Sequence, residues 1–280
     1  MSDSEIIYNV HNKNNNLVTK SFINKILSNF GIKKKVRNLD IWRRAFIHKS
    51  YCVHRKKVFK NEAFDFPVDG YEYIPLQEKS CETLEWLGDG IIQSVTAQYL
   101  WKRFPDQNEG FLTKTRSKLV RTETLARFSR YLKLKKYILL SQYMENICNA
   151  RDNPKSLEDA FEALIGAMSE DLGDTPAQSY KICYKFIVTI IERVIDFTEL
   201  IQKDDNYKDQ LMRFYHQKFN GVNPTYENLL VDASKKIKIY TEVVRHLEDR
   251  SIIIGKGTAR SKKEAQQIAA KAALRYHKVL

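Results

Sequence analysis

The apolar residues in the first part of the chain recur at the spacing of three and four that is typical of amphipathic helices. Gly31 and Pro105 mark helix ends, and Pro176 stands where the first turn of a helix tolerates proline. The pattern predicts an all-α region over residues 21–200, with helices at residues 21–32, 39–54, 80–104, 112–134, 156–167 and 175–200.

The pattern changes after a short polar stretch at residues 201–206, which we expect to be a linker. Residues 207–280 form a predicted α+β module, in which Ser261 can cap a last, alanine-rich helix. Its predicted order is a helix at residues 207–219, strands at 225–231, 239–247 and 251–254, and the last helix.

Two further stretches have no clear period. Residues 1–20 contain an asparagine-rich patch, and we expect a flexible N-terminal segment there. Residues 55–79 mix prolines, acids and aromatic residues, which favours a surface insertion packed by its own aromatic side chains.

The net charge of the chain is +13 and its pI is near 9.4, as expected for a protein that binds a polyanion such as nucleic acid. The excess of lysine could also serve solubility alone. No apolar run approaches the length that spans a membrane, so we expect no membrane association. The four cysteines are far apart, which argues against a zinc site or a disulfide framework and favours a reducing, intracellular location.

Residues 81–90 (CETLEWLGDG) concentrate acids in a segment that is otherwise mostly apolar. On a helix, Glu82, Glu85 and Asp89 lie within roughly 60° of one another. Such a stripe repels itself, and it suits a divalent cation. Gly88 and Gly90 lie in the middle of the predicted helix, where glycine is kept when another element approaches the backbone closely.

A second acidic pair, Asp159 and Glu162, lies three residues apart in a segment that is apolar almost all round. Asp159 has an alternative interpretation, because Ser156 and Asp159 have nearly the spacing of a capping box. Glu162 has no such alternative. A buried carboxylate needs a cation or a network of hydrogen bonds.

Lys262 and Lys263 fall in the first turn of the last helix, where cations oppose the helix dipole. Helix stability does not explain them, but contact with a phosphate backbone does.

The C-terminal module resembles the double-stranded RNA-binding domain family, most clearly at Gly255-x-Gly257 and over residues 261–274. The N-terminal region resembles the catalytic domain of ribonuclease III, in residues 81–90, in residues 159–167 and in the flanking segments 46–51 and 103–112. Together the two resemblances span about residues 35–280, and a member encoded by a virus would fit the composition.

The resemblance implies an all-α ribonuclease III domain followed by a small α-β-β-β-α module. It implies an endonuclease that cleaves double-stranded RNA as a homodimer with Mg²⁺, or with Mn²⁺ as a substitute, and leaves 5′ phosphates and 3′ overhangs. Trp86 stands where the family has a ring that plugs into the partner subunit. The implied catalytic acids are Glu82, Glu85, Asp89, Glu109, Asp159 and Glu162, of which Glu85, Asp89, Asp159 and Glu162 bind the metal.

RNA contacts are implied at Lys262, Lys263, Arg260, Lys235, Lys236 and Gln217. The loop at residues 232–236 lacks the family's usual Gly-Pro-x-His motif, so we expect charge to carry most of the affinity. The alternative function is a non-catalytic protein that sequesters or scaffolds RNA duplexes. All six acidic positions are filled, which favours the enzyme.

Overall fold

The structure is a computed structural model and describes residues 10–53, 73–202, 206–232 and 238–280. Its internal contacts divide the chain into two compact units, Met1–Leu200 and Ile201–Leu280. The first unit is helical and the second is α+β, so the predicted fold class is confirmed.

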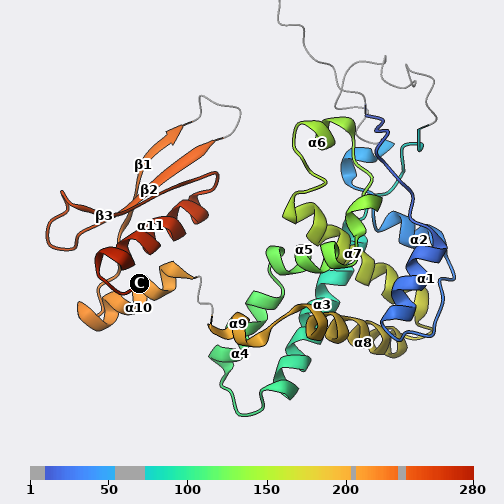
Figure 1. The fold of residues 1–280 in the computed structure, drawn as a ribbon, viewed down its shortest axis with the longest axis horizontal. Helices are drawn as coiled ribbons and strands as arrows, with labels where there is room; N and C mark the ends of the chain where they lie inside the picture. Colours follow the sequence, from blue (N-terminus) through green and yellow to red (C-terminus); the bar gives the residue numbers. More distant parts are fainter. Residues whose placement is uncertain (1–9, 54–72, 203–205, 233–237) are drawn as a thin grey trace, which may run out of the picture. The chain divides into compact units, whose positions relative to one another are not determined.

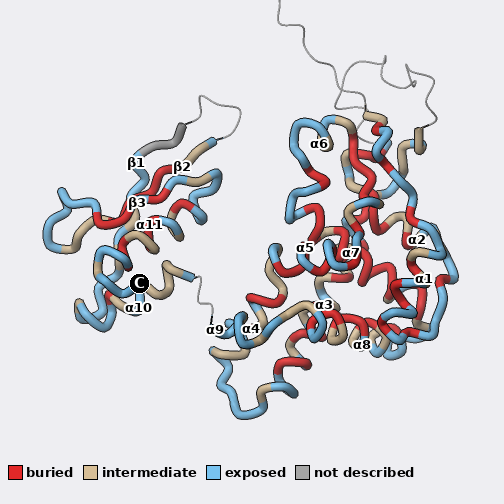
Figure 2. Tube along the Cα trace, in the orientation of Figure 1, coloured by how far each residue is buried: buried red, intermediate tan, exposed pale blue. Residues whose placement is uncertain are grey.

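The first unit is arranged around helix α7 (Pro154–Leu172), which is buried along most of its length. Asn153 caps α7, Pro154 occupies its first position, and it ends at Gly173. Figures 1 and 2 show α7 inside the helices that pack against it. These neighbours are α2 (Leu39–Arg44), α3 (Glu82–Arg103), α5 (Thr122–Tyr131) and α8 (Pro176–Val194).

The other α-helices described in this unit are α1 (Lys20–Asn29), α4 (Glu109–Leu119) and α6 (Gln142–Asn146), and α9 (Phe197–Gln202) begins in it and ends two residues past Leu200. Ile201 and Gln202, which we expected in the linker, complete α9. Residues 203–205 lie outside the described residues.

Three predicted helices are interrupted. The helix expected over residues 39–54 stops at Arg44, because Ile47 forms a bridge with Leu139 instead of a further turn. The helix expected over residues 112–134 is divided between α4 and α5, because Arg121 has an extended conformation. The Thr124 hydroxyl donates a hydrogen bond of 2.7 Å to the Lys118 carbonyl there. The helix expected over residues 175–200 stops at Val194.

The expectation of a flexible N-terminal segment is wrong for residues 10–19, which pack against the helical unit. Asn12 and Asn15 are buried, and their amide groups donate hydrogen bonds of 3.1 and 3.0 Å to the Leu140 carbonyl. Val18 is also buried. Residues 1–9 lie outside the described residues, and so do residues 54–72, which include most of the insertion expected over residues 55–79.

The second unit contains α10 (Tyr207–Lys218), β1 (Tyr226–Asp232), β2 (Ile239–Arg245), β3 (Ile253–Ala259) and α11 (Lys262–Tyr276). The strands form one antiparallel sheet in the order β1-β2-β3. Helix α11 packs on β2 and β3 and against α10. A Cβ at Gly257 would lie 2.1 Å from the Ala265 carbonyl oxygen, so glycine at this position permits the close packing of β3 on α11. The third strand extends further than expected, to Ala259.

Candidate active site

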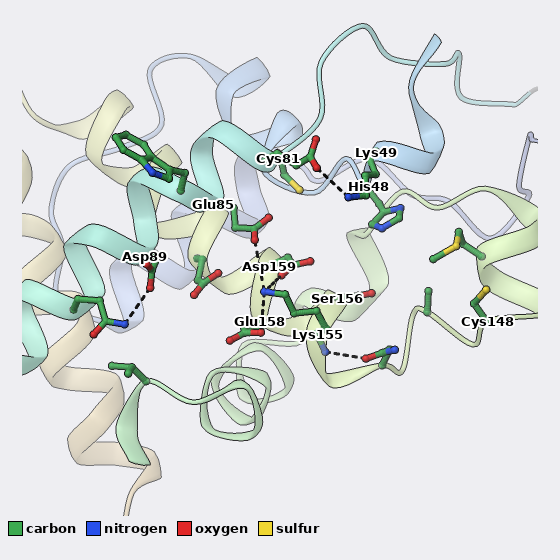
Figure 3. A pocket seen from close by; sticks show the side chains of 18 residues that line it. His48, Lys49, Cys81, Glu85, Asp89, Cys148, Lys155, Ser156, Glu158 and Asp159 are labelled. Carbon is green, nitrogen blue, oxygen red and sulfur yellow. Dashed lines mark hydrogen bonds and ion pairs between the residues drawn. The ribbon is translucent and has the colours of Figure 1, made fainter. Parts of the chain in front are cut away.

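A cavity of about 790 Å³ opens between α3, α7 and the segments that precede them (Figure 3). Five of the six predicted catalytic acids line it, and Glu109 alone among the six is absent from its walls. Helix α3 contributes Glu82, Glu85 and Asp89, and α7 contributes Asp159 and Glu162. The cavity therefore joins the two acidic motifs that the sequence keeps apart.

The five acids that line the cavity are brought together by a close crossing of two helices. A Cβ at Gly88 of α3 would lie 1.8 Å from the Glu162 carbonyl oxygen, and a Cβ at Gly166 of α7 would lie 2.2 Å from the Leu84 carbonyl oxygen. Only glycine at these two positions permits the backbones to approach so closely. Gly90, by contrast, lies on the exposed face of α3, and a Cβ added there would have nothing within 4 Å.

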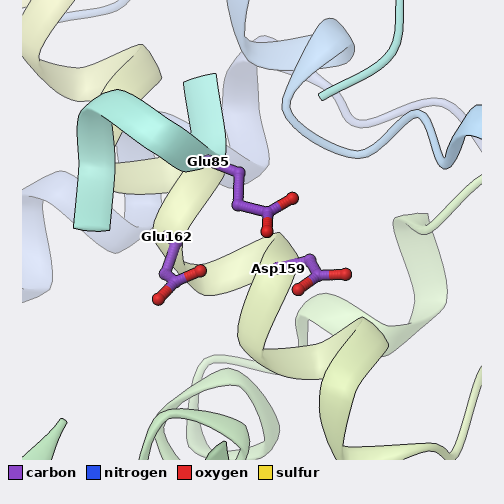
Figure 4. A group of neighbouring side chains, drawn as sticks. All are labelled: Glu85, Asp159 and Glu162. Carbon is purple, nitrogen blue, oxygen red and sulfur yellow. The ribbon is translucent and has the colours of Figure 1, made fainter. Parts of the chain in front are cut away.

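Glu85, Asp159 and Glu162 form the tightest group in the cavity (Figure 4). Each offers a carboxylate oxygen, and these three oxygens all lie within 4.8 Å of one another. The capping interpretation of Asp159 is wrong, because Asn153 is the N-cap of α7 and accepts a hydrogen bond of 2.9 Å from the Lys155 amide. Asp159 lies six residues after Asn153, and its side chain lines the cavity (Figure 3).

Burial and mutual repulsion raise the pKa values of two of these acids. Desolvation is the largest cause at Glu162, followed by the charge of Glu158, and together they raise its pKa to about 8. Desolvation, followed by the charge of Asp159, also raises the pKa of Glu85. Carboxylates held together in this way favour either protonation or a bound cation.

Asp89 and Glu82 lie in the same cavity but outside the tight group. The Asp89 carboxylate accepts a hydrogen bond of 3.2 Å from the Gln93 amide (Figure 3). Glu82 binds Lys49 at 3.1 Å and accepts a hydrogen bond of 3.0 Å from Ser80. The hydrogen bond from Lys49 is the main cause that lowers the pKa of Glu82, so this acid stays ionised. Cys81 is the N-cap residue of α3.

Glu109 does not line this cavity. It occupies the first position of α4, where a carboxylate is favourable to the helix dipole, and accepts a hydrogen bond of 2.9 Å from the Thr113 hydroxyl. Within the described part of a single chain, the structure does not bring Glu109 to the other acids.

Two residues of the cavity were missed by the sequence interpretation. Glu158 is buried and lines the cavity beside Glu162. Lys155 pairs with Glu158 and Asp159 through the spacings i,i+3 and i,i+4. That helical spacing was the available signal, since it places opposite charges on one face of a helix.

Trp86 of α3 is among the residues that line the cavity, and 79% of its surface is exposed. An exposed tryptophan is unusual because so large an apolar surface favours burial against another molecule. In this single chain Trp86 is available for such a contact.

The predicted RNA contacts of the second unit lie on exposed positions wherever they are described. Ser261 caps α11 and accepts a hydrogen bond of 3.2 Å from the Glu264 amide. Lys235 and Lys236 lie outside the described residues. The exposed positions are Arg260, Lys262, Lys263 and Gln217.

Comparison with known proteins assigns both units. Residues 82–173 match the ribonuclease III domain, and residues 207–277 match the double-stranded RNA binding motif. A protein named "Ribonuclease 3" from Chlorobium chlorochromatii is 35% identical over 207 residues, which cover 74% of this chain and 79% of that protein. A "Probable ribonuclease 3" from Acanthamoeba polyphaga mimivirus is 30% identical over 264 residues, which cover 94% of this chain and 46% of that protein.

Among solved structures, the nuclease domain of ribonuclease III from Campylobacter jejuni is similar, with 24% identity and a TM-score of 0.46. The similarity covers 62% of this chain and 98% of that one. Across the described residues, no helix has both the length and the apolar character needed to cross a bilayer.

A helical nuclease domain with an acidic cavity, followed by a double-stranded RNA binding module, defines the class as an RNA-cleaving hydrolase. The chain belongs to the ribonuclease III family and is an endoribonuclease specific for double-stranded RNA. This family depends on divalent metal ions, and the acidic cluster is the feature of this chain that fits one.

Proposed function

We propose that the chain hydrolyses phosphodiester bonds of double-stranded RNA with Mg²⁺ held by Glu85, Asp159 and Glu162. The observation that carries this proposal is the approach of the three carboxylate oxygens to within 4.8 Å of one another. Asp89 lies in the same cavity and completes the set of metal ligands that we propose. The products would carry 5′ phosphates and 3′ overhangs.

The donor set fits a hard cation. Mg²⁺ takes oxygen ligands at about 2.0–2.1 Å, so two oxygens on opposite sides of one ion lie about 4.2 Å apart. Three ligands of one ion cannot all lie opposite one another, so the three oxygens, which lie within 4.8 Å of one another, would have to move closer together, and rotation of their side chains allows this. Mn²⁺ also prefers carboxylate and water ligands, and we propose that it substitutes.

When bound, such an ion supplies an activated water and neutralises charge that develops on the leaving oxygen. The residues of the chain supply the rest. Glu162 is held in a desolvated position where its carboxylate is a strong ligand once ionised. Lys49 holds Glu82 at the rim, and Lys262 and Lys263 provide exposed cations for the phosphates of the duplex.

We further propose that two copies of the chain act together, each cutting one strand, with Trp86 in the contact between them. The exposed area of Trp86 supports this contact. We also propose an intracellular location. A protein that only sequesters RNA would have no need of buried, mutually repelling acids, so the acidic cluster favours catalysis over binding alone.

The proposal is tested with an end-labelled RNA duplex incubated with the full chain in Mg²⁺ and in EDTA, alongside the variants Glu162→Gln and Glu170→Gln. Glu170 lies on the same helix but is exposed, so it controls for the loss of a negative charge from α7. We expect the wild type and Glu170→Gln to cleave the duplex in Mg²⁺ but not in EDTA. A duplex that is bound but remains intact in Mg²⁺ would leave only the RNA-binding function.

A further inference from the structure

The ammonium group of Lys155 lies among the acids of the cavity (Figure 3). It is 2.7 Å from an Asp159 oxygen, 3.0 Å from a Glu158 oxygen and 3.7 Å from a Glu85 oxygen. Two of the four proposed metal ligands, Glu85 of α3 and Asp159 of α7, are therefore paired with one lysine. In this arrangement the positive charge lies where a cation bound by Glu85 and Asp159 would place its own.

Lys155 reaches this position from the first turn of α7, and its exposed side chain can move away from the acids. Its side chain is 57% exposed, whereas those of Glu158 and Asp159 are 10% and 19% exposed. The acids are fixed by their surroundings, and the long lysine stem can turn toward solvent. Lys49, the other lysine that lines the cavity, pairs with Glu82 at the rim.

We propose that Lys155 is the resident counter-ion of the metal site, which it neutralises until a divalent cation displaces it from Glu85 and Asp159. This inference rests on the proposed function, because it concerns the same acids. Displacement leaves Glu158 as the partner of Lys155, since Glu158 is one turn along the same helix and is not among the three grouped ligands.

Glu158 has a defined role in this exchange. It is buried, its carboxylate lies 3.0 Å from the Lys155 ammonium, and its charge also contributes to the raised pKa of Glu162. A lysine that keeps one acidic partner stays beside the cavity after the cation binds. There its ammonium can contact a phosphate oxygen of the RNA, which makes Lys155 a positioning residue for the substrate as well as a competitor of the metal.

The exchange is tested by Mn²⁺ binding, measured by electron paramagnetic resonance, and by thermal unfolding of the same samples. Lys155→Met removes the competing charge, so we expect Mn²⁺ to bind about five- to tenfold more tightly, a coupling of ordinary size for two ligands that exclude each other. Without metal, Lys155→Met should unfold at a lower temperature than the wild type, and saturating Mn²⁺ should reduce that difference.

Lys49→Met is the matched control, because Lys49 also lines the cavity, pairs with an acid and has a similar exposure of 51%. We expect it to change Mn²⁺ affinity by less than about twofold, since a charge that does not occupy the site is screened by solvent. If Lys155→Met does not fold, Lys155→Gln carries the same test.

The outcomes separate the inference from the function on which it rests. In one outcome, Glu162→Gln abolishes Mn²⁺ binding, but Lys155→Met binds Mn²⁺ no more tightly than the wild type does. That outcome would overturn the role of Lys155 and leave the metal site intact. If the wild type and Glu162→Gln instead bind Mn²⁺ equally well, the metal site itself is contradicted.

Discussion

Gly88 of α3 lies directly against the backbone of Glu162 on α7, so that a Cβ at Gly88 would be only 1.8 Å from the Glu162 carbonyl oxygen. The side chain of Glu162 and those of the acids on α3 line the same cavity. The distance between the two acidic motifs is therefore set by a glycine that carries no functional group of its own.

Gly88→Ala should separate α3 from α7, since the atom it meets is backbone and cannot turn aside. We expect a loss of about 2–4 kcal/mol in the free energy of unfolding and weaker divalent metal binding. Urea unfolding and Mn²⁺ titration measure the two effects. Gly90→Ala is the control, because its Cβ meets nothing, and it should be neutral or stabilise the helix by up to about 1 kcal/mol.

An unperturbed Gly88→Ala protein would show that the helices do not need this contact. The same pair of substitutions also tests the sequence interpretation, in which both glycines marked a close approach. The structure supports that interpretation for Gly88 and contradicts it for Gly90.

The fold was predictable where a helix end is marked by a local residue. Pro176 begins α8 and Pro105 follows the end of α3, and both positions follow from the chemistry of proline. The breaks after Arg44 and near Arg121 were not predictable. They depend on the bridge between Ile47 and Leu139 and on the extended backbone at Arg121. The local spacing of apolar residues does not indicate either feature.

The site was predictable as two acidic motifs but not as a geometry. Helical spacing placed the acids of α3 on one edge, and the apolar surroundings of Glu162 indicated burial. Glu158 was missed because only one side of α7 was considered. The place of Glu109 on α4, away from the cavity, depends on how α4 packs, which the spacing of acids does not reveal.

Glu162 should destabilise the metal-free protein at neutral and higher pH. Its pKa in the folded protein, about 8, lies above its ordinary value of 4.5, so the stability that it contributes is complete below pH 4.5 and is lost as the pH rises toward 8. Glutamine resembles the protonated acid at every pH. In EDTA, Glu162→Gln should be more stable than the wild type by roughly 1–3 kcal/mol at pH 8, with little difference at pH 5.

Thermal unfolding of both proteins between pH 5 and pH 9 measures this difference. A gap between the two proteins that stays constant with pH would contradict the raised pKa of Glu162. Saturating Mg²⁺ should reverse the order of stability at pH 8, because only the wild type retains the carboxylate ligand.

Trp86→Ala should weaken self-association of the chain. A tryptophan buried at the centre of an interface contributes about 2 kcal/mol or more, and a symmetric dimer of the variant lacks two of them, so we expect the dissociation constant of the dimer to rise about 1,000-fold. Sedimentation velocity over a range of concentrations measures this constant. Tyr131→Ala, which removes another exposed ring, should leave it unchanged. Equal dimerisation by wild type and Trp86→Ala would place the contact elsewhere.

Replacing Lys262 and Lys263 together with alanine should weaken duplex binding and reduce its dependence on salt. Loss of two phosphate contacts lowers the slope of log K against log salt by up to about 2. Filter binding in EDTA at several salt concentrations measures the slope without cleavage. The control replaces Arg250 and Lys256 with alanine, which removes the same charge from the same module. If both double variants lower the slope of log K against log salt equally, the assigned RNA contacts are contradicted.

The most direct test of the metal site is a crystal of the full chain grown with Mn²⁺ and measured near the manganese absorption edge. We predict an anomalous peak coordinated by oxygens of Glu85, Asp159 and Glu162, with the Lys155 ammonium withdrawn from Glu85 and Asp159. A manganese ion bound elsewhere, with these three carboxylates uncoordinated, would contradict the account.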